Sequence, residues 1–327
     1  MKSDKKRKIT IAVIAGISIF LIFIVVKGLY WWFEPYFHTV SGYDFDLGFG
    51  YRIIDDKVFL TYYGGEETIV YVPERLKGRK VVVGEYCFSG ENIEEVYVPS
   101  TVEVEGSAFT GCVNLRKFQG SSNTTIYSGT FYGNENLEEV LFTNTIEKIE
   151  GGAFWKCTNL KNVDFIKDVK YLGGQAFSHT NIEHLPALDN LEYAENDVFW
   201  PTPWEEKQEG DFIIVGNTLQ LYKGSDQVVY IPEGITTIWS AFMCMEEYKY
   251  PVQVREVYIS DSVEKIGYGA FDYQYNITVY IPESVVEIDE DIGKDSKMKI
   301  VTTKGSYAEE FAMEYGIEYE IVEGWEK

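Results

Sequence analysis

Hydrophobic positions recur along most of this chain in a unit of about 22 residues. In one copy, residues 134–156, the apolar positions are Leu137, Val140, Phe142, Ile146, Ile149, Ala153 and Phe154. Phenylalanines at the last of these positions stand 21 to 23 residues apart and are Phe88, Phe109, Phe131, Phe154, Phe177 and Phe199. A fixed period of this length predicts a solenoid of stacked repeats.

Each unit contains two short apolar stretches. Val140 and Phe142 flank one outward position, which is the period-two pattern of a strand with one buried face. Ile146 and Ile149 follow, and a small residue then precedes the Phe. Because a single unit buries too little apolar surface, we expect stacked units that share one core, with the Phe side chains in a file along the axis.

An asparagine recurs with the same period, at Asn92, Asn114, Asn136, Asn159 and Asn181. A buried Asn can satisfy the main-chain groups of a turn and of the neighbouring turn. We therefore predict a buried structural file of asparagines, with ligand binding as the alternative.

The repeat resembles a known family. The pattern Asn-Leu-x-x-Val-x-Phe, then Ile-x-x-Ile-x-x-x-Ala-Phe-x-x-Cys-x-Asn, is similar to the BspA-like class of bacterial leucine-rich repeat proteins and covers residues 43–327. Prolines that end strands (Pro73, Pro99, Pro232 and Pro282) and the stretch 304–311 also resemble that family. The resemblance implies a surface-displayed binding or adhesion module that has no catalytic residues and no cofactor.

The N-terminal segment predicts a membrane anchor. Residues 1–8 are basic, and residues 9–26 carry no charge, which as a helix spans about 27 Å, close to the thickness of the hydrocarbon core. A cleaved signal peptide is the alternative, but the apolar run is long for one and no Ala-x-Ala-like site follows it. We expect a cytoplasmic tail (1–8), a transmembrane signal anchor (9–29) and a juxtamembrane connector (30–42), with the repeats outside the cell membrane.

The remaining chain divides into two repeat blocks and a cap. The first block, 43–201, is predicted to open with a hairpin about the sequence Tyr62-Tyr63-Gly64-Gly65. The second, 202–304, opens with a hairpin about Gly216-Asn217 and continues the file with Phe242, Phe271 and Ile292. In the cap, 305–327, Ser306 and Glu309 form a capping box, a helix runs to about Tyr315, and a strand follows Gly316. The predicted fold is mainly β, with one transmembrane helix and this helix-strand cap.

The charge of the chain argues against two kinds of partner. The chain has 29 basic and 52 acidic residues. Without residues 1–8 and Lys27, 23 basic and 51 acidic residues remain, so the outer part is strongly acidic. This balance argues against nucleic acid, which requires a basic footprint, and against a solenoid that lies along an anionic lipid surface.

Residues with potential for chemistry do not form a recognisable catalytic motif. His179 and His184 lie near Ser178 and Asp189, but nothing in their context indicates a nucleophile elbow. Glutamates abound at outward repeat positions, which is typical of a solvated face. Residues 289–295 only faintly resemble a calcium loop, since the Gly comes one residue early. Cys112 and Cys157 share a slot two turns apart, and Cys87 replaces a small core residue, so we expect packing thiols, no disulfides and no metal site.

The outward strand position holds the strongest candidate for a binding surface. Aligned by register, it reads Tyr71, Tyr97, Gln119, Leu141, Asp164, Tyr230, Tyr258 and Tyr280. Tyrosine suits recognition of proteins and sugars, but it also favours strands, and stacked rings stabilise neighbouring turns without a ligand. The favoured hypothesis is an anchored extracellular module that binds a protein or glycan through Tyr71, Tyr97, Tyr230, Tyr258 and Tyr280. A structural spacer without a ligand, and less favoured a glycan-acting enzyme, are the alternatives.

Overall fold

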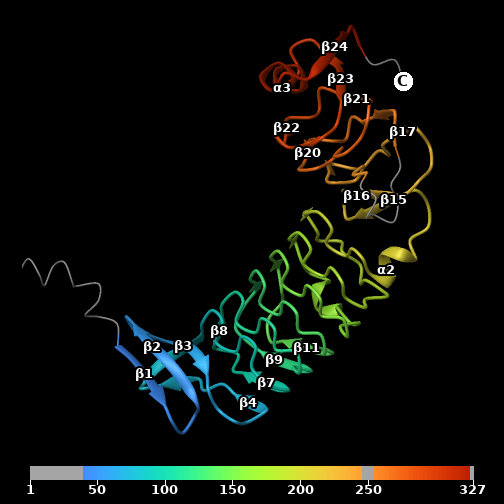
Figure 1. Cartoon of the computed structure of the whole chain (residues 1–327). Helices are drawn as coiled ribbons and strands as arrows, with labels where there is room; N and C mark the ends of the chain where they lie inside the picture. The colour runs from blue at the N-terminus through green and yellow to red at the C-terminus, as the bar shows by residue number, and fades with distance from the viewer. Residues whose placement is uncertain (1–39, 245–252, 325–327) are drawn as a thin grey trace, which may run out of the picture.

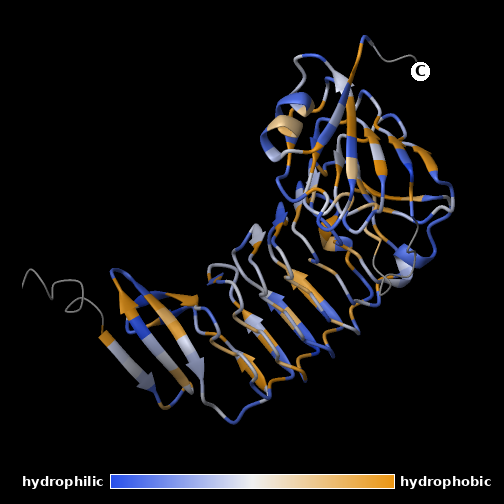
Figure 2. Ribbon diagram, turned by 45° about the horizontal axis from the view of Figure 1, so that its top comes forward, coloured by the Kyte–Doolittle hydropathy of each residue, from blue (hydrophilic) through white to orange (hydrophobic). Residues whose placement is uncertain are grey.

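The computed structural model describes residues 40–244 and 253–324, which form two blocks of stacked repeats along the chain (Figure 1). Most repeats contribute one short strand to each of two mainly parallel sheets. Figure 2 shows apolar residues along the repeating strands of both blocks. The predicted solenoid is thus confirmed. The predicted anchor, 9–29, lies outside the described residues, and none of the helices in the described part is long and apolar enough to cross a membrane.

An antiparallel sheet opens the first block, with strands β1 (Val40–Asp44), β2 (Phe49–Ile54) and β3 (Lys57–Tyr63). The predicted hairpin about Tyr62 and Tyr63 is wrong, because the turn lies at Asp55-Asp56, where Asp55 has φ +53°. Tyr63 ends β3 and is buried, with its ring 5.1 Å from that of Phe49 and 5.5 Å from that of Phe88. This tyrosine belongs to the core and therefore cannot form an exposed turn.

Parallel strands then build the two faces of the first block. The opening sheet continues through β6 (Arg79–Val83), which pairs with β3, β5 (Arg75–Leu76) and β8 (Glu103–Val104). The main sheet contains β4 (Ile69–Tyr71), β7 (Glu95–Val98), β9 (Lys117–Gly120) and β11 (Glu139–Phe142). The second face contains β10 (Thr125–Ile126), β12 (Lys148–Ile149), β13 (Tyr171–Leu172) and β14 (Tyr193–Ala194).

The second block repeats this plan and opens with the predicted hairpin. One sheet contains β15 (Phe212–Val215), β16 (Thr218–Tyr222), β18 (Thr237–Ile238), β20 (Lys265–Ile266) and β22 (Glu287–Ile288). The other contains β17 (Val228–Tyr230), β19 (Glu256–Tyr258), β21 (Ile277–Tyr280), β23 (Met298–Thr303) and β24 (Glu318–Val322).

The C-terminal cap forms as expected. Helix α3 (Tyr307–Tyr315) begins after Ser306, whose hydroxyl accepts a hydrogen bond from the Glu309 amide at 3.2 Å. Gly316 ends the helix in the left-handed region, at φ +67°. Strand β24 then pairs with β23 and completes the sheet.

The phenylalanine file is the centre of the first core. Successive rings from Phe88 to Phe199 are buried and stack with centroids 5.0 to 5.4 Å apart. In the second block Phe242 and Phe271 stack at 5.5 Å, and Ile292 is buried after them. The period-22 pattern therefore predicted the core correctly.

The asparagine file lies at the surface, which corrects the prediction that it is buried. Asn92, Asn114 and Asn136 are exposed. They still join neighbouring turns, because Asn114 donates to Asn92 Oδ1 at 2.6 Å and Asn136 donates to the Val113 carbonyl at 2.9 Å. The buried asparagine is Asn134, whose Oδ1 accepts the Cys112 amide at 2.9 Å.

The cysteines pack as small core residues. Cys87, Cys112 and Cys157 are buried and Cys244 is half-buried, and all four thiols are free. The Cys112 thiol donates to the Phe88 carbonyl at 2.8 Å, and the Cys157 thiol donates to the Phe131 carbonyl at 3.1 Å. Burial raises the pKa of these thiols, which keeps them protonated and unreactive.

Strand pairing is interrupted between the two blocks. Within the described residues, β14 and β16 are not paired, although each pairs with its neighbour on the other side. The short helix α2 (Pro203–Glu206) lies in the connection. The β15–β16 hairpin bridges the interruption, since Val215 joins the first core and Leu219 joins the second. The Gln220 amide adds a 2.7 Å bond to the Glu195 carbonyl.

Candidate binding surface

Strand register aligns the predicted tyrosines as expected. In the main sheet of the first block Tyr71 pairs with Tyr97, and in the second block Tyr230 pairs with Tyr258, which pairs with Tyr280. Gln119 and Leu141 continue the outward position on β9 and β11. Asp164 departs from the prediction, because the main sheet ends at β11 and residues Asp164–Ile166 form a 3-10 turn (η1).

Three rings form a ladder on the second block, which we name the C-terminal ladder: Tyr230, Tyr258 and Tyr280. The ring centroids of Tyr230 and Tyr258 are 4.7 Å apart with planes at 13°, and those of Tyr258 and Tyr280 are 4.0 Å apart with planes at 8°. The Tyr258 hydroxyl donates to Glu256 Oε2 at 2.8 Å. The hydrogen bond with Tyr280, burial and the Glu256 carboxylate together raise the pKa of Tyr258. The middle ring is thus held on both faces and at its hydroxyl.

The first block carries a shorter version of the same arrangement. Tyr71 and Tyr97 stack at 4.9 Å with planes at 11°, and the Tyr97 hydroxyl donates to Glu95 Oε2 at 2.6 Å. This bond is the main reason that the pKa of Tyr97 is raised. A Glu two residues before the Tyr, on the same strand face, therefore fixes one ring in each block.

The first ring of each ladder is more exposed than the rings that follow it. Tyr71 is 69% exposed and Tyr230 is 66% exposed, whereas Tyr97, Tyr258 and Tyr280 are half-buried. Tyr258 has a ring on each face, and Tyr97 and Tyr280 are each followed by a further strand, β9 and β23, so the first ring of each ladder is the most open to a ligand. Tyr258 therefore acts in packing, and Tyr230 and Tyr71 are the positions suited to contact.

A second aromatic cluster, which the sequence analysis missed, lies on the other face. Tyr171 and Tyr193 stack at 5.7 Å, and Trp239 of the second block meets Tyr193 edge-on at 6.3 Å. Lys265 Nζ lies 5.4 Å from the Tyr193 ring and 5.6 Å from the Trp239 ring. These contacts join the two blocks. The sequence did contain a signal for this cluster. In the second short strand of each repeat, a polar position precedes the buried residue, and Tyr171, Tyr193 and Lys265 occupy that position.

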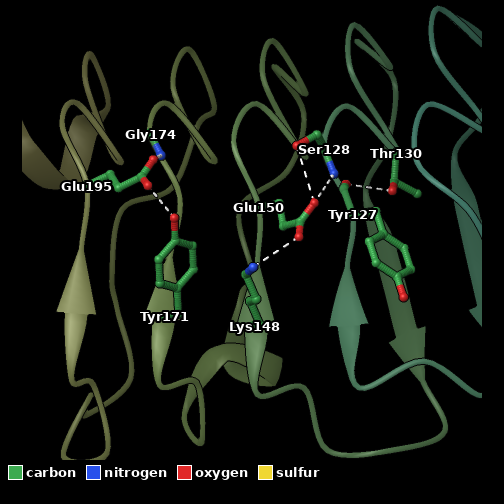
Figure 3. Close-up of polar contacts among 8 residues, drawn as sticks. All are labelled: Tyr127, Ser128, Thr130, Lys148, Glu150, Tyr171, Gly174 and Glu195. Carbon is green, nitrogen blue, oxygen red and sulfur yellow. Dashed lines mark hydrogen bonds and ion pairs between the residues drawn. The ribbon is translucent and has the colours of Figure 1, made fainter.

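Glutamate side chains connect successive turns beside this cluster (Figure 3). Glu150 accepts the Ser128 amide at 3.1 Å and pairs with Lys148 Nζ at 3.1 Å. Glu195 accepts the Gly174 amide at 2.7 Å and a short hydrogen bond from the Tyr171 hydroxyl. These carboxylates satisfy main-chain amides at the turns, so they are structural and not a free catalytic pair.

In the described part of the chain, His179 and His184 do not form a catalytic group. The His179 ring lies edge-on between Trp155 at 5.7 Å and Trp200 at 5.9 Å, and desolvation lowers its pKa. His184 is exposed. Over the described ranges, 40–244 and 253–324, we find no group of three or more His, Cys, Asp or Glu side chains placed to hold a metal ion.

One carboxyl group at the block interruption is electrostatically unusual. Asp197 has φ +53° and lines a small cavity with Glu205, Gln220 and Ser240. Burial raises the pKa of Asp197 to about 6, although the Asn196 amide, at 3.2 Å, opposes the shift. The cavity is too small for an organic ligand, and we assign no chemistry to it.

Comparison with known proteins identifies the repeat. Residues 81–203 and 227–310 match the model of the BspA type leucine rich repeat region, in six copies. No curated protein matches the chain.

Several solved structures are similar to this chain over most of its length. A leucine rich cell surface protein from Faecalibacterium prausnitzii is 17% identical, with 88% of this chain and 95% of that chain covered and a TM-score of 0.46. The pneumococcal vaccine antigen PcpA is 12% identical, with 87% and 99% covered and a TM-score of 0.38. A leucine-rich repeat protein from Eubacterium ventriosum is 16% identical, with 82% and 73% covered and a TM-score of 0.40. On the strength of the repeat match, which spans more than half of its residues, this chain belongs to the BspA-type leucine-rich repeat family.

Proposed function

We propose that this protein is a non-enzymatic binding or adhesion module, anchored in the cell membrane by residues 9–29 and displayed outside the cell. Its partner is an extracellular protein or glycan that contacts the C-terminal ladder. The observation that carries the proposal is the open end of this ladder at Tyr230, which is 66% exposed although the rest of the ladder is packed. A rigid aromatic ring offers large contact area at a low cost in conformational entropy.

Neighbouring side chains support a recognition role for this end. Val228, on the same face of β17 two residues before Tyr230, is 42% exposed. Glu256 and Tyr258 lie opposite Val228 and Tyr230 on the next strand. The surface therefore joins an apolar ring and an aliphatic side chain to a carboxylate that can accept hydrogen bonds from hydroxyl or amine donors.

The test is a binding screen of residues 40–327 against glycans and matrix proteins, since both hydrophobic cores lie within residues 49–312. Tyr230→Ser should abolish binding of any ligand found, with the melting temperature nearly unchanged. Tyr71→Ser is the matched control, because Tyr71 is equally exposed and also stacks on one neighbour. If Tyr230→Ser still binds the ligand, the tyrosines belong to the scaffold, and a spacer is favoured. The same holds if the triple Ser variant of the ladder keeps its binding but shows a large fall in melting temperature.

Topology requires a separate test. Protease added to intact cells that express the full chain should remove the repeats and leave residues 1–8 protected. If the repeats and a cytoplasmic marker both resist the protease, the proposed orientation is wrong.

A further inference from the structure

The loop between β1 and β2 presents the most exposed large hydrophobic side chain of the described residues. Phe45 is 88% exposed and Leu47 is 42% exposed. The loop is held by its own hydrogen bonds, since Asp44 Oδ1 accepts the Leu47 amide at 3.2 Å and the Asp44 carbonyl accepts the Gly48 amide at 2.8 Å. Gly48 has φ +72°, which completes the turn. The two apolar side chains are therefore presented to solvent by an ordered loop.

Further aromatic rings support this loop. The Tyr43 ring meets Phe45 edge-on at 4.9 Å and stacks on Tyr62 of β3 at 5.6 Å. Tyr62 is itself 49% exposed. We name these four residues, Tyr43, Phe45, Leu47 and Tyr62, the cap patch. An exposed aromatic and aliphatic patch of this kind marks an interaction surface.

A basic turn lies beside the cap patch. Lys77 Nζ is 3.2 Å from Asp44 Oδ2, so the β5–β6 turn contacts the base of the β1–β2 loop. The exposed cations of this turn and its strands are Arg75, Lys77, Arg79 and Lys80.

Charge is unevenly distributed along the repeats. Residues 40–83 contain six basic and seven acidic side chains, whereas residues 84–324 contain 16 basic and 42 acidic ones. The overall charge argues against a solenoid that lies along an anionic surface, but the opening sheet alone is close to neutral and carries its own cationic turn.

The proposed anchor would bring a bilayer close to this end. If residues 9–29 span the membrane, ten residues, 30–39, connect the span to β1, and ten extended residues reach at most about 35 Å. We infer that the cap patch and the basic turn rest on the anionic lipid surface that holds the anchor. This inference depends on the anchor of the proposed function.

The chemistry of the surface fits this partner. Aromatic side chains favour the membrane–water interface, where the ring is apolar and the hydroxyl stays hydrated. Lysine and arginine near the surface are attracted by anionic headgroups. The acidic residues beyond residue 84 are repelled by the same headgroups, so the solenoid stands on its opening sheet and holds the C-terminal ladder away from the bilayer.

The test uses the full chain in phosphatidylglycerol vesicles with an environment-sensitive fluorophore on the loop. Asp46→Cys carries the label, because Asp46 is exposed between Phe45 and Leu47. Cys244→Ser removes the one thiol that is not fully buried. Ser225→Cys, exposed in the second block, is the matched control. We expect a blue shift and quenching by brominated lipid at position 46 and neither at position 225, with both effects lost on adding Phe45→Ser.

Other outcomes overturn the inference in distinguishable ways. If the chain floats with the vesicles but the label at position 46 stays in water, the cap contact is refuted and the proposed anchor is not. A blue shift without quenching would show that protein, such as residues 30–39, covers the patch. A chain that does not float with vesicles would refute the anchor and the cap contact together. Equal quenching in neutral phosphatidylcholine vesicles would refute the role of the basic turn.

Discussion

Replacement of Phe154 by Ala is the most direct test of the stacked core. The Phe154 side chain is fully buried, and its ring lies 5.1 Å from Phe131, 5.1 Å from Phe177 and 5.6 Å from Phe165. Truncation of a buried Phe costs about 3–5 kcal/mol through the transfer and cavity terms. Aromatic pairs contribute about 0.5–1.5 kcal/mol each beyond burial, and three of them are lost here. We therefore expect a loss near the upper limit, about 5 kcal/mol.

The loss should be confined to one block. The two hydrophobic cores are separate clusters, and strand pairing between the blocks is interrupted at β14 and β16 in the described structure. Repeats interact mainly with their neighbours, so a cavity at residue 154 acts chiefly on the first block. Hydrogen exchange read by mass spectrometry should show faster opening of residues 131–177 in Phe154→Ala, with residues 257–281 little changed.

Phe271→Ala provides the matched control, since Phe271 is buried in the second block and stacks on Phe242 at 5.5 Å. It should produce the reverse pattern of exchange. A loss below about 1 kcal/mol in Phe154→Ala would refute the Phe file as the core. Equal loss of protection in both blocks would refute their independence.

Three substitutions test individual contacts elsewhere in the described chain. Asn134→Ala should cost about 0.5–1.5 kcal/mol in denaturant unfolding, because it removes the 2.9 Å hydrogen bond to the buried Cys112 amide and leaves that amide only its 3.3 Å bond to the Phe109 carbonyl. Asn136→Ala should cost less, because the Val113 carbonyl that Asn136 serves can bond water at the surface instead. The raised pKa of Asp197 means that the folded state binds more protons than the unfolded state, so unfolding free energy should fall as pH rises from about 4 to about 6 and then level off; Asp197→Asn should remove this component of the slope. Gly120→Ala should greatly lower the melting temperature, because Gly120 has φ +121° and an added Cβ would lie 1.6 Å from the Val98 carbonyl oxygen.

Most of the architecture could be predicted because the period is strong. Phe154 and its counterparts are fixed by packing, which requires the same large apolar residue at each turn. The capping box at Ser306 and the Gly-Asn turn at 216–217 are local, so their sequence signals were sufficient. These features depend on few long-range contacts.

The errors arose where tertiary contacts outweigh a local signal. Tyr63 and Gly64 resemble a turn, but Tyr63 contributes its ring to the core and Asp55 adopts the turn conformation instead. Asn136 recurs with the same period as the core residues, yet its side-chain amide lies at the surface and donates a hydrogen bond to the main chain of the preceding turn. For the candidate site, the register of the tyrosines was predictable. Which ring faces are open was not, because this depends on the order of stacking, with Tyr230 first and Tyr258 between two rings.

The interruption at β14 and β16 has a mechanical consequence for the anchored adhesion module that we propose. Hydrogen bonds between parallel strands point along the solenoid axis, so a pull along that axis acts on them directly. At the interruption the load falls on the Gln220 bond, on the contacts of Tyr193 with Trp239 and Lys265, and on the packing of Val215 in the first core. We therefore expect the second block, with its tyrosine ladder, to separate from the first block before either block unfolds. The chain would then lengthen under load while both cores stay folded.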